Sequence, residues 1–251
     1  MNTTTSTRIN TTTTLSAGQA STLSLNPGYL ARRNALDWVF AVLVAGGFLY
    51  AFAQYSAYMD VYEKGILFAT IPATIAIGWF WRPLRLLMGV VAVLSLLSIA
   101  SYQGDLARAE QIFWLKYFLS SQSAILWMSM LFFMSTVFYW LGMFASTAPT
   151  GNGGSSHSAT LESLGSKIAW VGVGMALIGT LVRWYESYLI GPDVGHIPVS
   201  NLYEVFVLFC WMTTAFYLYF EAEYKTRSLG AFVMLVVSGA VGFLLWYTVL
   251  R

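Results

Sequence analysis

The sequence has 251 residues, of which 57% are hydrophobic and only 10% are charged. In soluble domains roughly a quarter of the residues are charged, so this composition indicates an integral membrane protein. The formal net charge of +2 is too small and too scattered to indicate a nucleic-acid partner. The single cysteine, Cys210, excludes a disulfide framework within the chain and a Cys-rich metal site.

Residues 1–34 are rich in Ser and Thr and contain no apolar core of signal-peptide length. Asn26, Pro27 and Gly28 close this stretch just before Arg32 and Arg33. Because such a segment cannot bury enough apolar surface to offset chain entropy, we expect a disordered tail rather than a cleaved signal peptide.

Seven apolar runs follow, each long enough or nearly long enough to cross about 30 Å of hydrocarbon as a helix. Small residues recur four apart within them, as at Gly172 and Ala176, and this spacing lets helices approach closely. The runs predict an all-α fold, a polytopic bundle of about seven transmembrane helices. They cover residues 36–55, 65–81, 84–100, 124–145, 168–182, 205–220 and 230–250.

Basic residues predict the orientation of this bundle. The pairs Arg32/Arg33, Arg82/Arg85 and Lys225/Arg227 all fall on one side of the membrane when the helices alternate. Positive charge in short loops marks the cytoplasmic side, so we expect a cytoplasmic N-terminus in the cytoplasmic membrane. Residues 101–123 and 183–204 are then extracytoplasmic.

Two connecting segments divide the chain into regions. Within residues 35–145, the external stretch 101–123 predicts an amphipathic helix lying on the membrane, or a contact surface for a partner or cofactor. Its apolar face is Ile112, Phe113, Leu115, Phe118 and Leu119. Residues 146–167, which include GNGGSSHS, predict a flexible cytoplasmic linker in which a solvated histidine has no function. Residues 168–251 carry the last three predicted helices.

The external segment 183–204, RWYESYLIGPDVGHIPVSNLYE, is a polar stretch with Gly and Pro between two apolar runs. Arg183 and Glu186 are three residues apart and can pair on one helix face, or Arg183 can bind an anionic group such as a propionate. Trp184 suits the aromatic belt at a membrane interface. Asn201 and Glu204 have the spacing of a capping box, which would open the next helix with its partly positive end facing outward.

His196 is the candidate functional residue of this segment. Although a loop histidine is ordinarily a surface residue, Gly195 and Pro198 restrict the backbone beside it. Haem binding needs an imidazole ligand, an aromatic surface and a cation or helix N-terminus near its propionates, and all three are present here. Zinc is disfavoured because no second ligand stands at metal-ligand spacing. The aromatic residues near His196 in sequence are Trp184, Tyr185, Tyr188 and Tyr203.

These residues also carry a family resemblance. RWYES, followed by GHIPVSNLYE and the apolar VFVLFCW, resembles the first external histidine segment of the CcsA/CcsB (ResC) family. This family is the haem-handling part of the System II cytochrome c synthase and is related to the CcmC proteins. FWLKYFLSSQSAILWMS resembles the upstream region of proteobacterial members. The similarity extends over most of the chain from about residue 35.

The resemblance implies a protein that presents haem b at the outer face of the membrane, for covalent attachment to the CxxCH cysteines of an apocytochrome c, together with a ResB-type partner. His196 matches the family's first external haem-ligand histidine. Trp184, Ser200, Asn201, Tyr203 and Glu204 match other positions of the motif, and Arg183 completes the expected haem-binding set.

In the family, a tryptophan-rich WDP segment lies downstream of a helix like 230–250, and this sequence contains no such segment. We therefore expect a truncated or split member, a subunit of the synthase complex that is not active alone.

Two other classes of function compete with this interpretation. A transporter or permease would carry ionisable residues inside the bilayer or broken helices at the midplane, and no charged residue falls near the centre of a predicted helix. In a purely structural membrane subunit, the His196 segment would be dispensable.

Overall fold

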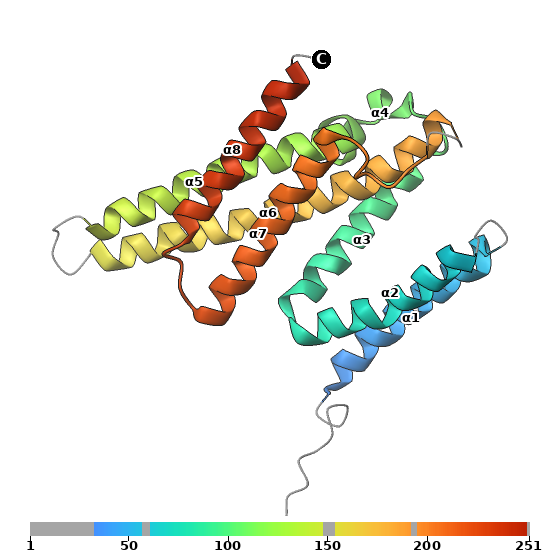
Figure 1. Cartoon of the computed structure of the whole chain (residues 1–251), viewed down its shortest axis with the longest axis horizontal. Coiled ribbons are helices and arrows are strands. Elements are labelled where there is room, and N and C mark those ends of the chain that lie inside the picture. The colour runs from blue at the N-terminus through green and yellow to red at the C-terminus, as the bar shows by residue number, and fades with distance from the viewer. Residues whose placement is uncertain (1–32, 57–60, 148–153, 192–194, 250–251) are drawn as a thin grey trace, which may run out of the picture. The chain divides into compact units, whose positions relative to one another are not determined.

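The computed structural model describes residues 33–56, 61–147, 154–191 and 195–249. All regular secondary structure in these ranges is helical (Figure 1), which confirms the all-α prediction. The chain divides into two compact units, residues 1–79 and 80–251. The predicted tail falls outside the described residues up to residue 32.

The first unit holds α1 (Ala35–Tyr55) and most of α2 (Val61–Phe80). Asn34 caps α1 in a capping box with Asp37, whose carboxylate accepts the Asn34 N–H at 2.9 Å. The indole N–H of Trp79 donates to the backbone carbonyl of Asp37 at 2.9 Å and joins the two helices. This hydrogen bond closes the helix pair at the start of α1.

The second unit begins with α3 (Pro83–Tyr102), which has Pro83 in its first turn and ends at Gln103 in the left-handed conformation. After two short segments come α5 (Ser121–Thr147), α6 (Gly154–Ile190), α7 (Leu202–Tyr224) and α8 (Gly230–Val249). The main hydrophobic core lies among α5, α6, α7 and α8. A smaller core joins α3, α5 and α6.

The α5–α6 hairpin forms the centre of this unit, and the two helices lie side by side in Figure 1. Gly165, Gly172 and Gly179 follow one another two helical turns apart along α6. A Cβ atom at Gly172 would lie 2.6 Å from the Phe132 ring, and one at Gly165 or Gly179 would lie 3.0 or 2.9 Å from an α5 side chain. The predicted close approach at small residues is therefore confirmed at Gly172.

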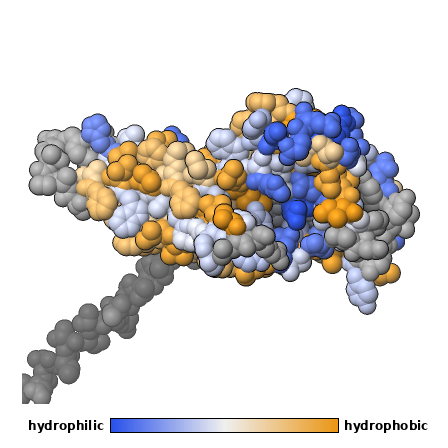
Figure 2. All heavy atoms as spheres, turned by 90° about the horizontal axis from the view of Figure 1, so that it is seen from above, coloured by the Kyte–Doolittle hydropathy of each residue, from blue (hydrophilic) through white to orange (hydrophobic). Residues whose placement is uncertain are grey.

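Six described helices are long and apolar enough to span a membrane: α1, α3, α5, α6, α7 and α8. The remaining predicted span, residues 65–81, corresponds to α2, whose apolar part, Lys64–Phe80, is shorter and contains Pro72. Large hydrophobic side chains are exposed along these helices, as at Leu86 and Val42. Hydrophobic residues cover much of the face shown in Figure 2. The chain is therefore a polytopic membrane protein.

The structure corrects the prediction of a flexible linker over residues 146–167. α5 runs to Thr147 and α6 begins at Gly154, so residues 154–167 are helical and only 148–153 lie outside the described residues. The hydroxyl of Ser135 donates to the carbonyl of Gly165 at 2.8 Å, and Ser158 is buried. Packing against α5 thus overrides the weak helix propensity of the Gly- and Ser-rich segment.

The predicted amphipathic helix in 101–123 is in fact two short segments, α4 (Arg108–Gln111) and the π-helix η1 (Leu115–Leu119). Ile112 between them is extended. Leu115 is fully buried, whereas Phe113 is 67% exposed, so the predicted apolar face is split between core and surface. The indole of Trp127 donates to the Tyr117 carbonyl at 2.8 Å and ties η1 to α5.

Candidate functional site

The candidate site lies where α6 ends and α7 begins. α6 continues to Ile190, beyond the predicted end at residue 182, and therefore carries Arg183 and Glu186 on its last turns. The loop that follows leads through His196 to Asn201, the N-cap of α7. Both walls of the site are thus helix termini, which hold the side chains of the loop between them.

The start of α7 confirms half of the predicted capping box. The Asn201 side chain accepts the Glu204 N–H at 2.9 Å, as an N-cap residue should. The Glu204 carboxylate does not return to the Asn201 N–H, however. It accepts the backbone N–H of Ser200 at 3.0 Å and its hydroxyl at 3.2 Å. The box is shifted by one residue toward the loop.

Glu204 brings two predicted site residues together. Its side chain is 4% exposed, yet the Nε of Arg183 lies 3.8 Å from Oε1 and the Nε2 of His196 lies 3.8 Å from Oε2. Buried carboxylates are stable only with partners, and Ser200 supplies the two close ones. The Arg183 guanidinium and the His196 imidazole lie farther from the carboxylate than the two Ser200 donors do.

Arg183 lies between two carboxylates. A terminal nitrogen of its guanidinium lies 3.9 Å from Glu186, the partner expected from the sequence, while Nε faces Glu204. The Arg183 side chain is 35% exposed and therefore remains accessible. The local pair expected from the sequence is confirmed.

Glu186 holds the end of α6 in place through partners that the sequence does not reveal. Its carboxylate accepts the Tyr102 hydroxyl of α3 at 2.5 Å, and the Ser121 N–H and hydroxyl of α5 at 3.1 and 2.5 Å. These partners are 84 and 65 residues away along the chain. The only sequence signal is a carboxylate at the end of an apolar helix. Glu186 thus fixes three helices around Arg183.

The backbone of His196 is held by Ser187. The Ser187 hydroxyl lies 3.3 Å from both the amide nitrogen and the carbonyl oxygen of His196. The Tyr188 ring lies so close to Gly195 that a Cβ there would collide with it, which requires glycine beside the histidine. The His196 side chain itself is 40% exposed. Its backbone is therefore fixed while its imidazole stays accessible.

The predicted aromatic residues around His196 divide into two groups. Tyr185 is partly buried against the Tyr102 ring, with 6.1 Å between ring centroids. Trp184 and Tyr188 are 40% and 51% exposed. The exposed pair can contact a ligand or the membrane interface, whereas Tyr185 packs the core.

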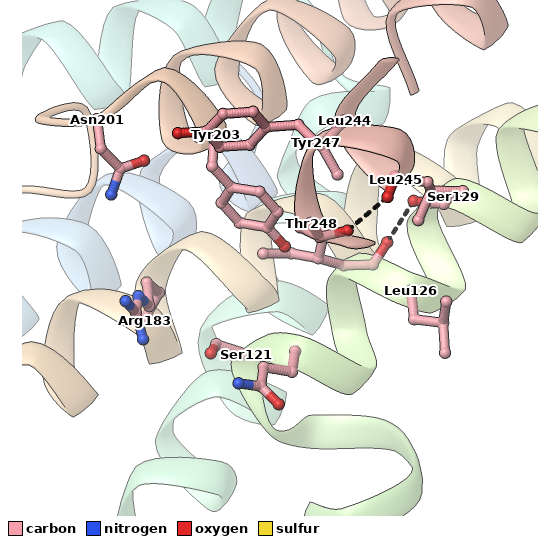
Figure 3. A pocket seen from close by; sticks show the side chains of 12 residues that line it. Ser121, Leu126, Ser129, Arg183, Asn201, Tyr203, Leu244, Leu245, Tyr247 and Thr248 are labelled. Atoms are coloured by element: carbon pink, nitrogen blue, oxygen red, sulfur yellow. Dashed lines mark hydrogen bonds between the residues drawn. The ribbon is translucent and has the colours of Figure 1, made fainter. Parts of the chain in front are cut away.

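A cavity of about 440 Å³ opens beside the His196 cluster, which consists of Arg183, His196 and Glu204 (Figure 3). Arg183, Asn201 and Tyr203 line it together with the apolar side chains of Leu126 and Leu244. Figure 3 shows Arg183 and Asn201 on one side of the cavity and Leu126 across from them. His196 does not line the cavity but is connected to Arg183 through Glu204. The cavity is apolar with a cationic edge, which suits an amphiphilic ligand that carries carboxylates.

Across the described ranges, no group of three or more His, Cys, Asp or Glu side chains could hold a metal ion. The partly exposed imidazole of His196 is a single nitrogen donor. This suits a metal whose other ligands come from a prosthetic group or a second protein.

Curated proteins named cytochrome c biogenesis protein CcsA match this chain. The Chlorella vulgaris protein is 33% identical over 116 residues, which are 45% of this chain and 31% of that protein. The Gloeobacter violaceus protein is 31% identical over 111 residues, 44% of this chain and 28% of that protein. The Trichormus variabilis protein is 30% identical over 111 residues, 44% of this chain and 27% of that protein.

This chain is similar to these CcsA proteins over less than half of its own length. It spans less than a third of the length of these CcsA relatives. No family model matches the chain, and no solved structure matches it.

Proposed function

We propose that this chain acts in cytochrome c biogenesis by presenting haem b at the outer face of the cytoplasmic membrane. Its CcsA relatives are named for cytochrome c biogenesis. The observation that carries the proposal is the meeting of His196, Glu204 and Arg183 at the start of α7, beside a cavity with a cationic edge. Haem is the substrate here.

The residues at this site fit haem. His196 has an exposed imidazole on a fixed backbone, the arrangement that an axial iron ligand needs. Arg183 lines the cavity and can bind a propionate, with the partly positive start of α7 adding to the attraction. Tyr203 and Leu244 offer apolar surface to the porphyrin, and exposed Trp184 can contact it from the loop. The iron supplies the coordination bond.

One ligand histidine leaves the haem accessible to other proteins. A ResB-type partner and an apocytochrome c with a CxxCH motif are the partners we propose. The apocytochrome supplies the thiols that form the thioether bonds, and this chain orients the haem. The His196 loop then faces the extracytoplasmic side, and the chain acts as a subunit of a synthase complex.

A gene deletion in the organism that carries the chain tests this role. We expect the deletion to remove covalent haem from c-type cytochromes, measured by haem staining of denatured membrane proteins on gels. The wild-type gene and a His157→Ala variant restore the stain, because His157 is exposed at the start of α6. A His196→Ala variant, present in the membrane at wild-type amount, restores less than about a tenth of it. Unchanged cytochromes in the deletion strain would refute the proposal.

A further inference from the structure

A second cavity, of about 450 Å³, lies at the other end of α7. α6 contributes Glu162, Ser166 and Trp170 to its lining, and the end of α7 contributes Glu221. Lys225 and Arg227, in the turn before α8, complete its polar wall. α7 has 23 residues, so this cavity lies about 35 Å from the His196 cluster along the helix.

The charges that line this cavity differ in how they are paired. Glu221 is fully engaged, because its carboxylate accepts the Tyr139 hydroxyl at 2.6 Å and the Arg227 Nε at 2.9 Å. Glu162 on α6 and Lys225 after α7 have no ion-pair partner within 4.0 Å among the residues that the structure describes. The cavity thus presents one available carboxylate and one available ammonium, each from a different helix.

Lys225 occupies a backbone conformation that favours glycine. It is the C-cap residue of α7 in the left-handed conformation, with φ of 51°. Glycine is favoured at such a position because a Cβ atom is strained there. Strained residues gather at functional sites, so the lysine side chain itself is a candidate for binding.

The surroundings of the cavity fit a membrane interface. Tyr224 and Leu229 flank the turn and are 68% and 59% exposed. Aromatic and apolar side chains at a helix end beside basic residues are typical of the level of lipid head groups. Trp170, which lines the cavity, packs against Trp81 in a tilted arrangement with ring centroids 5.0 Å apart.

We propose that this cavity binds the phosphoethanolamine head group of an aminophospholipid. Glu162 accepts hydrogen bonds from the primary ammonium, and Lys225 binds the phosphate, with Arg227 adding positive charge beside it. The two acids and two bases of the lining balance, which favours a ligand carrying both charges over a purely anionic one. The lipid's acyl chains remain in the bilayer beside the exposed apolar side chains.

The test compares lipids that differ only in their amine. The full chain is purified in detergent with equal amounts of phosphatidylethanolamine and phosphatidylcholine, and bound lipids are counted by native mass spectrometry. Quaternary choline cannot donate hydrogen bonds to Glu162. We expect the wild-type chain to retain phosphatidylethanolamine about tenfold better, the effect of one charge-assisted hydrogen bond.

Two variants remove the two charges separately. Glu162→Gln abolishes this preference, whereas Lys225→Gly lowers the retention of both lipids, because Lys225 binds the phosphate that they share. Lys225→Gly also raises the thermal midpoint because glycine relieves the left-handed strain. Lys167→Gln is the matched control, since Lys167 is exposed on the same part of α6 outside the cavity lining and its loss leaves the preference intact.

Free phosphoethanolamine distinguishes the two possible sources of the head group. Displacement of the lipid by the free compound supports a site that recognises the head group alone. Preference without displacement supports a site that needs the intact lipid. Equal retention of the two lipids by the wild-type chain, an unchanged preference in Glu162→Gln, or unchanged retention of both lipids in Lys225→Gly would overturn the proposal. Neither result depends on haem.

Discussion

The two ends of α7 each carry a buried glutamate, but the two carboxylates are paired in different ways. Glu221, 8% exposed, receives hydrogen bonds from Tyr139 and Arg227 at 2.6 and 2.9 Å. Glu204, 4% exposed, receives its close hydrogen bonds from Ser200, while Arg183 and His196 stay at 3.8 Å. Burial is nearly equal, so burial alone does not separate the two roles.

The two carboxylates differ in how closely the neighbouring basic side chains approach them. The hydrogen bond to Glu221 raises the pKa of Arg227 above its ordinary value, so this side chain stays charged and paired. Around Glu204 the nearby serine supplies the close hydrogen bonds, while Arg183 and His196 lie 3.8 Å from the carboxylate with side chains that are 35% and 40% exposed. The tight pair at Glu221 joins α7 to its neighbours, and we propose that the looser cluster around Glu204 serves binding.

The largest effect on stability should come from breaking the tight pair. We expect Glu221→Ala to lower the free energy of unfolding by about 3 kcal/mol, because it leaves Arg227 and the Tyr139 hydroxyl without their acceptor. Thermal unfolding in detergent measures the loss. Glu223→Ala, an exposed change two residues away, should leave the midpoint unchanged. Equal shifts in both variants would contradict the proposed difference between the two ends.

At the other end, the expected effect is on binding more than on stability. Glu204→Gln keeps an acceptor for the Ser200 N–H but removes the negative charge that orients Arg183 and His196. We expect haemin affinity to fall about tenfold while stability falls by about 1 kcal/mol. Haemin titration followed by absorption, beside thermal unfolding, separates the two. A large loss of stability with unchanged affinity would assign Glu204 a structural role only.

A smaller effect is expected at the N-cap of α7. Asn201→Ala removes the acceptor for the Glu204 N–H and should lower the free energy of unfolding by about 1 kcal/mol. Hydrogen exchange in the first turn of α7 reports the change. Asn34→Ala at the complete capping box of α1 is the matched comparison and should cost at least as much. No change at either cap would show that packing alone fixes these helix ends.

Local patterns predicted much of this fold. Each of the seven apolar runs lies on a long helix, because hydrophobic length is visible in the sequence. The predicted start of α6 was wrong because the Gly and Ser residues there favour a loop locally. Packing against α5, as in the hydrogen bond from Ser135 to the Gly165 carbonyl, favours the helix instead. The amphipathic pattern around Leu115 did not show the break at Ile112, nor that Leu115 is buried while Phe113 is exposed.

The candidate site divides in the same way. The Arg183–Glu186 pair and the Asn201 cap follow from spacings of three residues, which the sequence displays directly. The partners of Glu186 on α3 and α5 depend on tertiary contacts that no local pattern encodes. The meeting of His196 with Glu204 depends on the path of the loop. The haem role of these residues stays a prediction.

The most direct test of the central claim is the absorption spectrum of the detergent-purified chain with equimolar haemin, oxidised and reduced. The comparison is wild type, His196→Ala and His157→Ala. We expect a Soret band that is the same in wild type and His157→Ala but weaker or shifted in His196→Ala. Identical spectra for the two histidine variants would contradict the assignment of His196 as the haem ligand.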